Sequence, residues 1–228
     1  MMKVQYHPSW SGFLTEENIK LLKTTIGEIA KEQFTPSIDL ALKFLSTDLG
    51  SAQVVILGMD PYPQKGRATG RAFEDGTISS WASLKHNASL ANILKLIYAN
   101  RNNEEIFPIS NVKKRVAELG NISPPNELFK SWESQGVLLL NTALTCRIGK
   151  SGSHLKHWQE FSKRCFQHIA INRSDMPWLL WGKDAQQAAP DGILCLTSKH
   201  PRLYSKKAGS FLAENHFKKI TTINWAGT

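Results

Sequence analysis

Three polar residues with catalytic chemistry each follow or close a predicted strand: Asp60, Asn141 and His200. A carboxylate can orient water and offset positive charge, an amide can read the edge of a heterocycle, and a neutral imidazole can donate to developing negative charge. Each residue alone also has a structural explanation, such as a turn or a loop hydrogen bond. Because several convergent polar groups are typical of an active site, we expect the three to share one pocket.

Asp60 lies where a short apolar run meets a proline-rich turn. After Gln53, a run of β-branched and apolar residues ends at Gly58, which indicates a buried parallel strand. Pro61 and Pro63 fix their own φ and restrict the residue before each of them, so Asp60 and Tyr62 are held in extended geometry. Ligands of parallel sheets bind beyond the carboxyl ends of the strands, and Asp60 is at such an end.

The remaining pattern alternates strands with helices. Strands are predicted at Gln53–Gly58, Val137–Asn141, Trp178–Gly182 and Ile193–Thr197. Helices are predicted at about Thr15–Gln33, Ser37–Leu45, Ser89–Tyr98, Val112–Leu119, His157–Ile171, Asp184–Ala188 and Gly209–Ile220. Long helical crossovers between strands predict the α/β class: a three-layer α/β/α sandwich around a central four-stranded parallel sheet.

The stretch Asn100–Asn126 is polar and contains Pro108, Pro124 and Pro125, and it is predicted to be a loop with one embedded helix. The chain has no internal repeat, no low-complexity tract and no composition change that would mark a linker. We therefore expect a single domain over residues 1–228.

The composition points to a polyanionic partner. The 228 residues carry a formal net charge of +9 at a pI of about 9.5, which fits nucleic acid, although a basic surface that binds nothing has the same charge. The three cysteines form no C-x-x-C pair, so we expect reduced thiols rather than disulfides. Without an apolar signal core or a membrane-length apolar segment, the chain is expected to be soluble, not secreted and not membrane-bound.

Cofactor motifs are missing from the sequence. The glycines after the first strand form neither G-x-G-x-x-G nor G-x-x-x-x-G-K-[ST], and the zinc-deaminase pattern is absent as well. His154 and His157 would share a helical face, but no third metal ligand lies near them in the sequence. We therefore expect no metal and no cofactor.

Ordered motifs across most of the chain resemble those of family 1 uracil-DNA glycosylases. The resemblance covers about residues 53–225, with Ser89-Leu90-Ala91-Asn92-Ile93 and Ser153-His154 also in the expected order. Its main motifs are Gly58-Met59-Asp60-Pro61-Tyr62-Pro63, Gly70-Arg71-Ala72-Phe73, Leu138-Leu139-Leu140-Asn141-Thr142, Leu179-Leu180-Trp181-Gly182, and His200-Pro201 with Ser205.

The resemblance implies an enzyme that hydrolyses the N-glycosidic bond of uracil in DNA, leaves an abasic site and so initiates base excision repair. The target base would be rotated out of the DNA stack before cleavage. Asp60 and His200 would be catalytic: Asp60 would activate water and offset charge on the sugar, and His200 would donate toward uracil O2.

The same resemblance implies four uracil-binding residues. Met59 would contribute its backbone N–H, Phe73 would stack on the base, and Tyr62 would fill the space that the thymine methyl group needs. Asn141 would pair with uracil N3–H and O4, a pattern that cytosine reverses, so cytosine would leave buried polar groups mispaired.

DNA contacts are expected at Ser89 and in the basic segment that follows His200. Cations and serine would hold phosphates while Leu203 or Tyr204 fills the gap left by the flipped base. A solvated basic loop would have the same composition. The predicted DNA-binding residues are Ser89, Arg202, Leu203, Tyr204, Ser205, Lys206 and Lys207.

Several residues depart from the family pattern. Met59 replaces the usual glutamine and Pro63 the usual histidine, as in the poxvirus branch, and Arg67 and Thr69 replace a glutamine and a histidine. These changes leave two alternatives to uracil release: a glycosylase for another damaged or modified pyrimidine, or a non-catalytic DNA-binding or replication-accessory protein.

The expected partner is uracil-containing DNA, single- or double-stranded, with a protein inhibitor or replication protein as a further possibility. The chain is expected to be a monomer. Its expected location is the cytoplasm if the source is bacterial, and otherwise the nucleus or another compartment that holds DNA.

Overall fold

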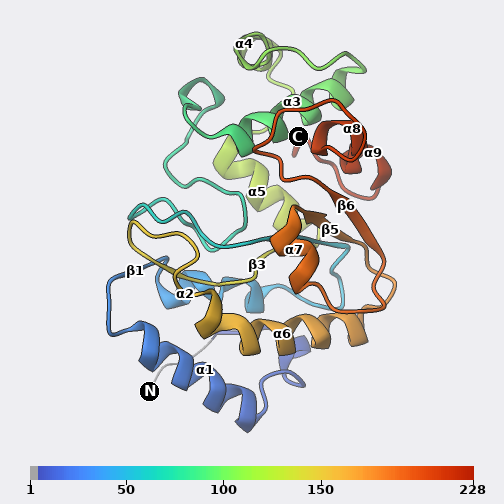
Figure 1. Cartoon of the computed structure of the whole chain (residues 1–228). Coiled ribbons are helices and arrows are strands. Elements are labelled where there is room, and N and C mark those ends of the chain that lie inside the picture. Colours follow the sequence, from blue (N-terminus) through green and yellow to red (C-terminus); the bar gives the residue numbers. More distant parts are fainter. Residues whose placement is uncertain (1–4) are drawn as a thin grey trace.

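The computed structural model describes residues 5–228 and has helices on both faces of a central sheet (Figure 1). Residues 1–4 of the predicted domain lie outside the described residues. The predicted α/β/α sandwich is confirmed. Within the described part of the chain, no helix is both long and apolar enough to cross a bilayer.

The central sheet contains four parallel strands in the order β3-β2-β5-β6. Their bounds are Val137–Asn141 for β3, Val54–Gly58 for β2, Trp178–Trp181 for β5 and Cys195–Ser198 for β6. All four predicted strands are therefore confirmed, although β6 begins and ends later than expected. Ile193 and Leu194, the first two residues of the predicted strand, precede β6, whose pairing begins between Cys195 and Trp178.

Strand alternation divides the core into two clusters, because successive side chains point to opposite faces of a sheet. On one face, Val54 and Ile56 pack with the helices between β2 and β3 and with the C-terminal helices. On the other face, Val55 and Leu57 pack with the N-terminal helix and with the helix between β3 and β5. Both faces are covered, which explains why the strands are apolar along their whole length.

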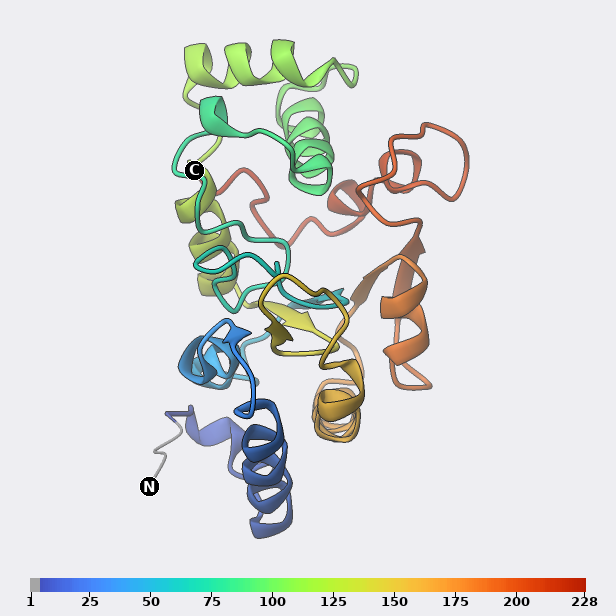
Figure 2. The ribbon, with the colours of Figure 1, turned by 60° about the vertical axis from the view of Figure 1, so that its left-hand side comes forward.

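The strand order reverses beside β2. The chain passes from β2 to β3 over one face of the sheet, then returns over the other face to β5 on the opposite side of β2 (Figure 2). In open parallel sheets, such a switch point leaves a crevice at the carboxyl ends of the strands, where ligands bind. Asp60 follows β2, and Asn141 closes β3 at the same level, paired with Gly58.

The helices mostly follow the prediction, with shifted bounds. The α-helices are α1 (Glu16–Ile29), α2 (Ile38–Ala41), α3 (Ala88–Asn102), α4 (Ile109–Leu119), α5 (Pro125–Ser134), α6 (Leu155–Asn172), α7 (Lys183–Ala188), α8 (Phe211–Glu214) and α9 (His216–Lys219). Short 3-10 helices occur at Pro8–Trp10, Lys43–Ser46 and Trp81–Ser83. Residues 100–126 contain the embedded helix that was expected, α4, together with the end of α3 and the start of α5.

Three features differ from the prediction. The helix α5 was missed because Pro124 and Pro125 indicated a loop, whereas Pro125 occupies the first helical position, where its missing N–H costs nothing. The single helix predicted at Gly209–Ile220 is wrong: Asn215, at φ 42°, separates α8 from α9. Similarly, the helix predicted at Ser37–Leu45 is divided into α2 and a 3-10 turn.

A small antiparallel sheet was also missed. It pairs β1 (Phe34–Thr35) with β4 (Cys146–Arg147). Strands of two residues are too short to show an alternating pattern. This pairing fixes the start of the loop 148–154, which reaches the carboxyl ends of the central strands.

Candidate active site

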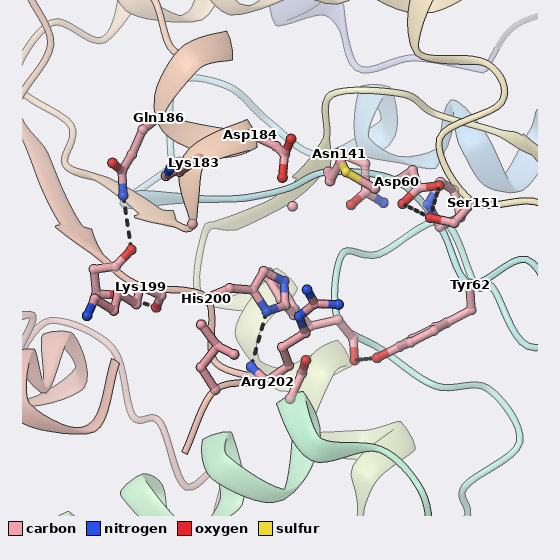
Figure 3. Close-up of a pocket in the computed structure, with 18 of the residues that line it drawn as sticks. Asp60, Tyr62, Asn141, Ser151, Lys183, Asp184, Gln186, Lys199, His200 and Arg202 are labelled. Atoms are coloured by element: carbon pink, nitrogen blue, oxygen red, sulfur yellow. Dashed lines mark hydrogen bonds between the residues drawn. The ribbon is translucent and has the colours of Figure 1, made fainter. Parts of the chain in front are cut away.

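A cavity of about 970 Å³ opens at the carboxyl ends of the central strands. Among the residues that line it are all those predicted to catalyse or to bind uracil: Met59, Asp60, Tyr62, Phe73, Asn141 and His200. The volume is at the upper end of the range for small-molecule pockets. The three strand ends therefore converge as predicted (Figure 3).

Asp60 is half-buried, and the loop 148–154 holds its carboxylate. The Gly152 N–H donates to Oδ2 over 2.6 Å, and the Ser151 hydroxyl lies 3.0 and 2.9 Å from the two carboxylate oxygens. Burial raises the pKa of Asp60, these two donors oppose the rise, and the negative charge of Asp184 adds to it. The carboxylate is thus fixed in direction while it remains open to the cavity.

Asn141 presents a buried amide to the cavity. Only 5% of the residue is exposed, and its side chain has no hydrogen-bond partner among residues 5–228. Gly58 pairs with Asn141 in the parallel register and has no side chain, since a Cβ there would clash with Asn141 Oδ1. A buried amide without a protein partner is costly unless a ligand pairs with it.

His200 enters the cavity from the loop after β6. Its Nδ1 accepts the Arg202 N–H over 3.1 Å, which places the ring proton of the neutral imidazole on Nε2. Burial lowers the pKa of His200, and the nearby Arg202 lowers it further. A neutral donor is therefore available at neutral pH. Gly182 permits the approach, because a Cβ on it would lie 3.1 Å from His200 Cβ.

Phe73 has a strained backbone. Its φ of 66° lies in the left-handed region, which is uncommon for an aromatic residue and costs free energy that surrounding contacts must offset. The ring centroid lies 5.2 Å from that of Trp181 and 5.8 Å from that of His200. The strained backbone thus directs an aromatic side chain to the cavity wall beside the imidazole.

Tyr62 forms part of the wall beside the proline turn. Its hydroxyl accepts from Asn87 Nδ2 over 3.0 Å and donates to the Phe73 carbonyl over 3.4 Å. Burial raises the pKa of Tyr62, so the phenol stays protonated at neutral pH. Met59 also lines the cavity, and its carbonyl accepts from the Thr142 hydroxyl over 2.6 Å, which ties the turn after β2 to β3.

The predicted DNA-binding residues fall into two groups. Ser89, Arg202 and Leu203 line the cavity. Tyr204, Ser205, Lys206 and Lys207 lie further along the same loop, outside that lining. Leu203 and Tyr204 are 48% and 59% exposed, and the Lys95 ammonium lies 4.6 Å from the centre of the Tyr204 ring. Both candidate wedge residues are therefore at the surface beside the cavity.

The cavity residues that sequence reasoning missed include Ser151, Lys183, Asp184 and Gln186. Lys183, Asp184 and Gln186 belong to α7, which starts directly after the predicted third strand, and that position was a usable signal. Ser151 had none, since only the folded loop 148–154 brings it to Asp60, 91 residues away in sequence.

The two histidines considered as metal ligands have other partners. His154 is buried between the Thr145 hydroxyl at 2.9 Å and the Glu32 carboxylate at 3.1 Å, and His157 lies 3.0 Å from Glu28. In the described part of the chain, no group of three or more His, Cys, Asp or Glu side chains is placed to hold a metal ion.

Comparisons with known proteins agree with this geometry. The family model of the uracil DNA glycosylase superfamily matches residues 46–222. A uracil-DNA glycosylase of Salmonella agona is 33% identical over 92% of this chain and 86% of its own length. One of Pseudomonas paraeruginosa is 30% identical over 98% of this chain and 96% of its own.

Solved structures share the fold. The wild-type UNG of Nitratifractor salsuginis has a TM-score of 0.74 at 24% identity, over 96% of this chain and 92% of its own. The mimivirus uracil-DNA glycosylase has a TM-score of 0.70 at 23% identity, over 95% and 82%. A mutant of the mimivirus UNG has been solved in complex with UGI. By family model, by relatives and by fold, this chain belongs to the uracil-DNA glycosylase superfamily.

Proposed function

We propose that this protein is a uracil-DNA glycosylase, which hydrolyses the N-glycosidic bond of uracil in DNA and leaves an abasic site for base excision repair. The observation that carries the proposal is the buried Asn141 amide, which faces the cavity without a protein partner among residues 5–228. A base edge with the pattern of uracil supplies what this amide lacks: a donor at N3 and an acceptor at O4.

Asp60 acts on the sugar side of the bond. When the C1′–N1 bond breaks, its electron pair leaves with N1 of uracil, the sugar becomes positive, and water forms the new bond to C1′. The Asp60 carboxylate orients that water, accepts the proton that the water loses and stabilises the sugar cation. The donors from Ser151 and Gly152 keep one face of the carboxylate engaged, so that its direction is set before substrate binds.

His200 acts on the base side. The leaving uracil carries negative charge on O2, and a neutral imidazole with its proton on Nε2 can donate to that oxygen. The Arg202 N–H holds the required tautomer through Nδ1. A donor that strengthens as charge develops accelerates the reaction, and loss of such a donor typically costs about 2.7–4 kcal/mol.

The cavity walls select the base. Phe73 provides the stacking surface, Asn141 reads N3–H and O4, the Met59 backbone N–H supports the base, and Tyr62 excludes a methyl group at C5. The wall residues come from β2, β3 and the loops between them. Their positions relative to one another therefore depend on the parallel sheet.

DNA binds across the loop after β6. Ser89 and Ser205 contact phosphates together with Arg202, Lys206 and Lys207, and Leu203 or Tyr204 enters the duplex where the base has left. The arginine and lysine side chains of this loop are exposed, which suits this contact, because neutralisation of phosphates supplies much of the affinity for DNA. The formal net charge of +9 supports the same surface role.

Further properties follow from the same proposal. The protein works as one domain and as a monomer, without metal or cofactor. It works in the cytoplasm if its source is bacterial, as the sources of its relatives are, and otherwise in the nucleus or another compartment that holds DNA. A protein inhibitor is a further partner in this proposal, because a mimivirus UNG forms a complex with UGI.

The proposal is tested with duplex and single-stranded oligonucleotides that carry uracil, cytosine or thymine at one position. In the presence of EDTA, we expect the purified protein to release uracil and leave an alkali-labile abasic site, and to release cytosine and thymine far more slowly. Specific DNA binding without release would instead support a binding protein, and preferential release from a modified pyrimidine would support a different glycosylase.

A further inference from the structure

Tyr62 is held by a closed ring of polar contacts. Arg67 covers its aromatic face, with Cζ 4.4 Å from the ring centre, and Asn87 donates to its hydroxyl over 3.0 Å. Asp75 joins these two partners, because it accepts from Arg67 and from Asn87 through the same oxygen, Oδ2. We call these residues, Tyr62, Arg67, Asp75 and Asn87, the Tyr62 network.

Asp75 is the buried centre of this network. Its side chain is 2% exposed, and Arg67 donates to Oδ2 from both Nε and Nη2 at 2.7 Å. The second oxygen accepts from the Thr77 hydroxyl over 2.6 Å and from the Thr77 N–H over 3.2 Å. Despite burial, the hydrogen bonds from Thr77, Arg67 and Asn87 hold the pKa of Asp75 below its usual value. The Asp75 carboxylate is therefore charged and fully paired, and it holds the Arg67 guanidinium in place.

The network also joins Tyr62 to a helix. Asn87 caps α3, since its Oδ1 accepts the Leu90 N–H over 3.1 Å. The loop that carries Arg67 is closed by the Gly76 N–H, which donates to the Arg67 carbonyl over 2.9 Å. Both the hydroxyl end and one ring face of Tyr62 are thus fixed to rigid parts of the fold.

We propose that the Tyr62 network determines base specificity, by holding the tyrosine ring where it excludes substituents at C5 of the pyrimidine, and that Arg67 is its specificity-determining residue. The inference rests on the proposed function, in which Tyr62 forms the wall beside C5. A tyrosine fixed only at its backbone could shift by rotation about its side-chain bonds, and a small shift would admit a methyl group. With its ring face covered and its hydroxyl bonded, that shift requires breaking the network.

Arg67 is suited to this role by its chemistry. A guanidinium packs flat on an aromatic face and donates several hydrogen bonds in fixed directions, whereas a glutamine, the residue expected here from the family resemblance, has fewer donors and no charge. Asp75 supplies the charge that keeps the guanidinium over the ring. None of these residues needs to touch the reacting atoms, so they act as positioning residues.

The test compares Arg67→Ala, Arg67→Lys and Asp75→Asn with the parent on oligonucleotides that carry uracil, 5-fluorouracil or thymine. For each base, kcat/KM of the variant is divided by that of the parent, which cancels the intrinsic reactivity of the base. We expect this variant-to-parent ratio to rise with the size of the C5 substituent. In Arg67→Ala, the ratio for thymine should be about tenfold higher than the ratio for uracil, which is within the range for one methyl group in a pocket. Arg67→Lys should restore part of the discrimination.

Arg115→Ala is the matched control. Arg115 also lies over an aromatic ring, with Cζ 4.6 Å from the centre of Phe107, and it pairs with Glu104 at 2.6 Å. Neither Arg115 nor Phe107 lines the cavity. This variant should leave the ranking of the three bases unchanged, even if its melting temperature falls.

The outcomes separate the network from the proposed function. If Arg67→Ala lowers all three rates in the same proportion, the network is only structural and the inference is wrong. Tyr62→Ala is included in the series: if it also fails to admit thymine, the role assigned to Tyr62 in the proposed function is wrong instead. A parent protein without uracil release would overturn the proposed function itself.

Discussion

The substitution Asn141→Asp tests how the cavity distinguishes uracil from cytosine. The amide oxygen accepts from uracil N3–H and the amide nitrogen donates to O4, whereas cytosine presents an acceptor at N3 and a donor at N4. A carboxylic acid in the same place can accept from the cytosine amino group and, when protonated, donate to N3. The variant should therefore bind cytosine with matched hydrogen bonds.

The size of the effect follows from the burial of Asn141. Asn141 is only 5% exposed, so once a base fills the cavity water cannot replace a missing partner, and each mispaired buried group then costs about 1–3 kcal/mol. Two such mispairings amount to about 2–6 kcal/mol, or about 30-fold to 20,000-fold in relative rate at 1.4 kcal/mol per factor of ten. We expect the ratio of kcat/KM for cytosine to that for uracil to rise by at least about 30-fold.

The assay measures base release from matched oligonucleotides that contain a single uracil or cytosine. Asn111→Asp is the control: it makes the same change of side chain on the exposed surface of α4, outside the cavity lining, and should leave the ratio unchanged. A thermal unfolding curve confirms that both variants are folded. If Asn141→Asp releases cytosine no faster than the parent, Asn141 does not read the base.

Two further predictions concern pH and DNA distortion. Burial and the charge of Asp184 raise the pKa of Asp60, so kcat/KM should fall as pH drops through that pKa. The variant Asp184→Asn removes this charge, so it should move the acidic limb of the kcat/KM profile to lower pH. An unchanged acidic limb would contradict the coupling between the two carboxylates. If Leu203 or Tyr204 is the wedge, its replacement by alanine should lower release from duplex DNA much more than from single-stranded DNA, and equal losses on both substrates would exclude that residue.

The sequence was sufficient to predict the sheet and the residues that its strands position. Apolar strands with polar residues at their ends produce a strong pattern, and parallel pairing brings those ends to one edge, so Asp60 and Asn141 could be placed together before the structure was known. His200 was predicted in the same way, although its tautomer depends on the Arg202 N–H, which no pattern reveals.

Other parts of the site depend on contacts that have no sequence pattern. Ser151 reaches Asp60 only because a two-residue strand pairing fixes the loop that carries it. The left-handed backbone of Phe73 and the contacts of Arg67 with Tyr62 are likewise products of tertiary packing, which local propensity does not encode. At α5, the proline that indicated a loop was in fact the first residue of a helix.

The central claim is that Asp60 acts in the chemical step of uracil release. The most direct measurement is the single-turnover rate of uracil release by Asp60→Asn at saturating protein, together with its affinity for the same DNA. We expect affinity close to that of the parent and a rate lower by about 1,000-fold, as for the loss of about 4 kcal/mol of transition-state stabilisation. Uracil release at the rate of the parent would contradict the mechanism.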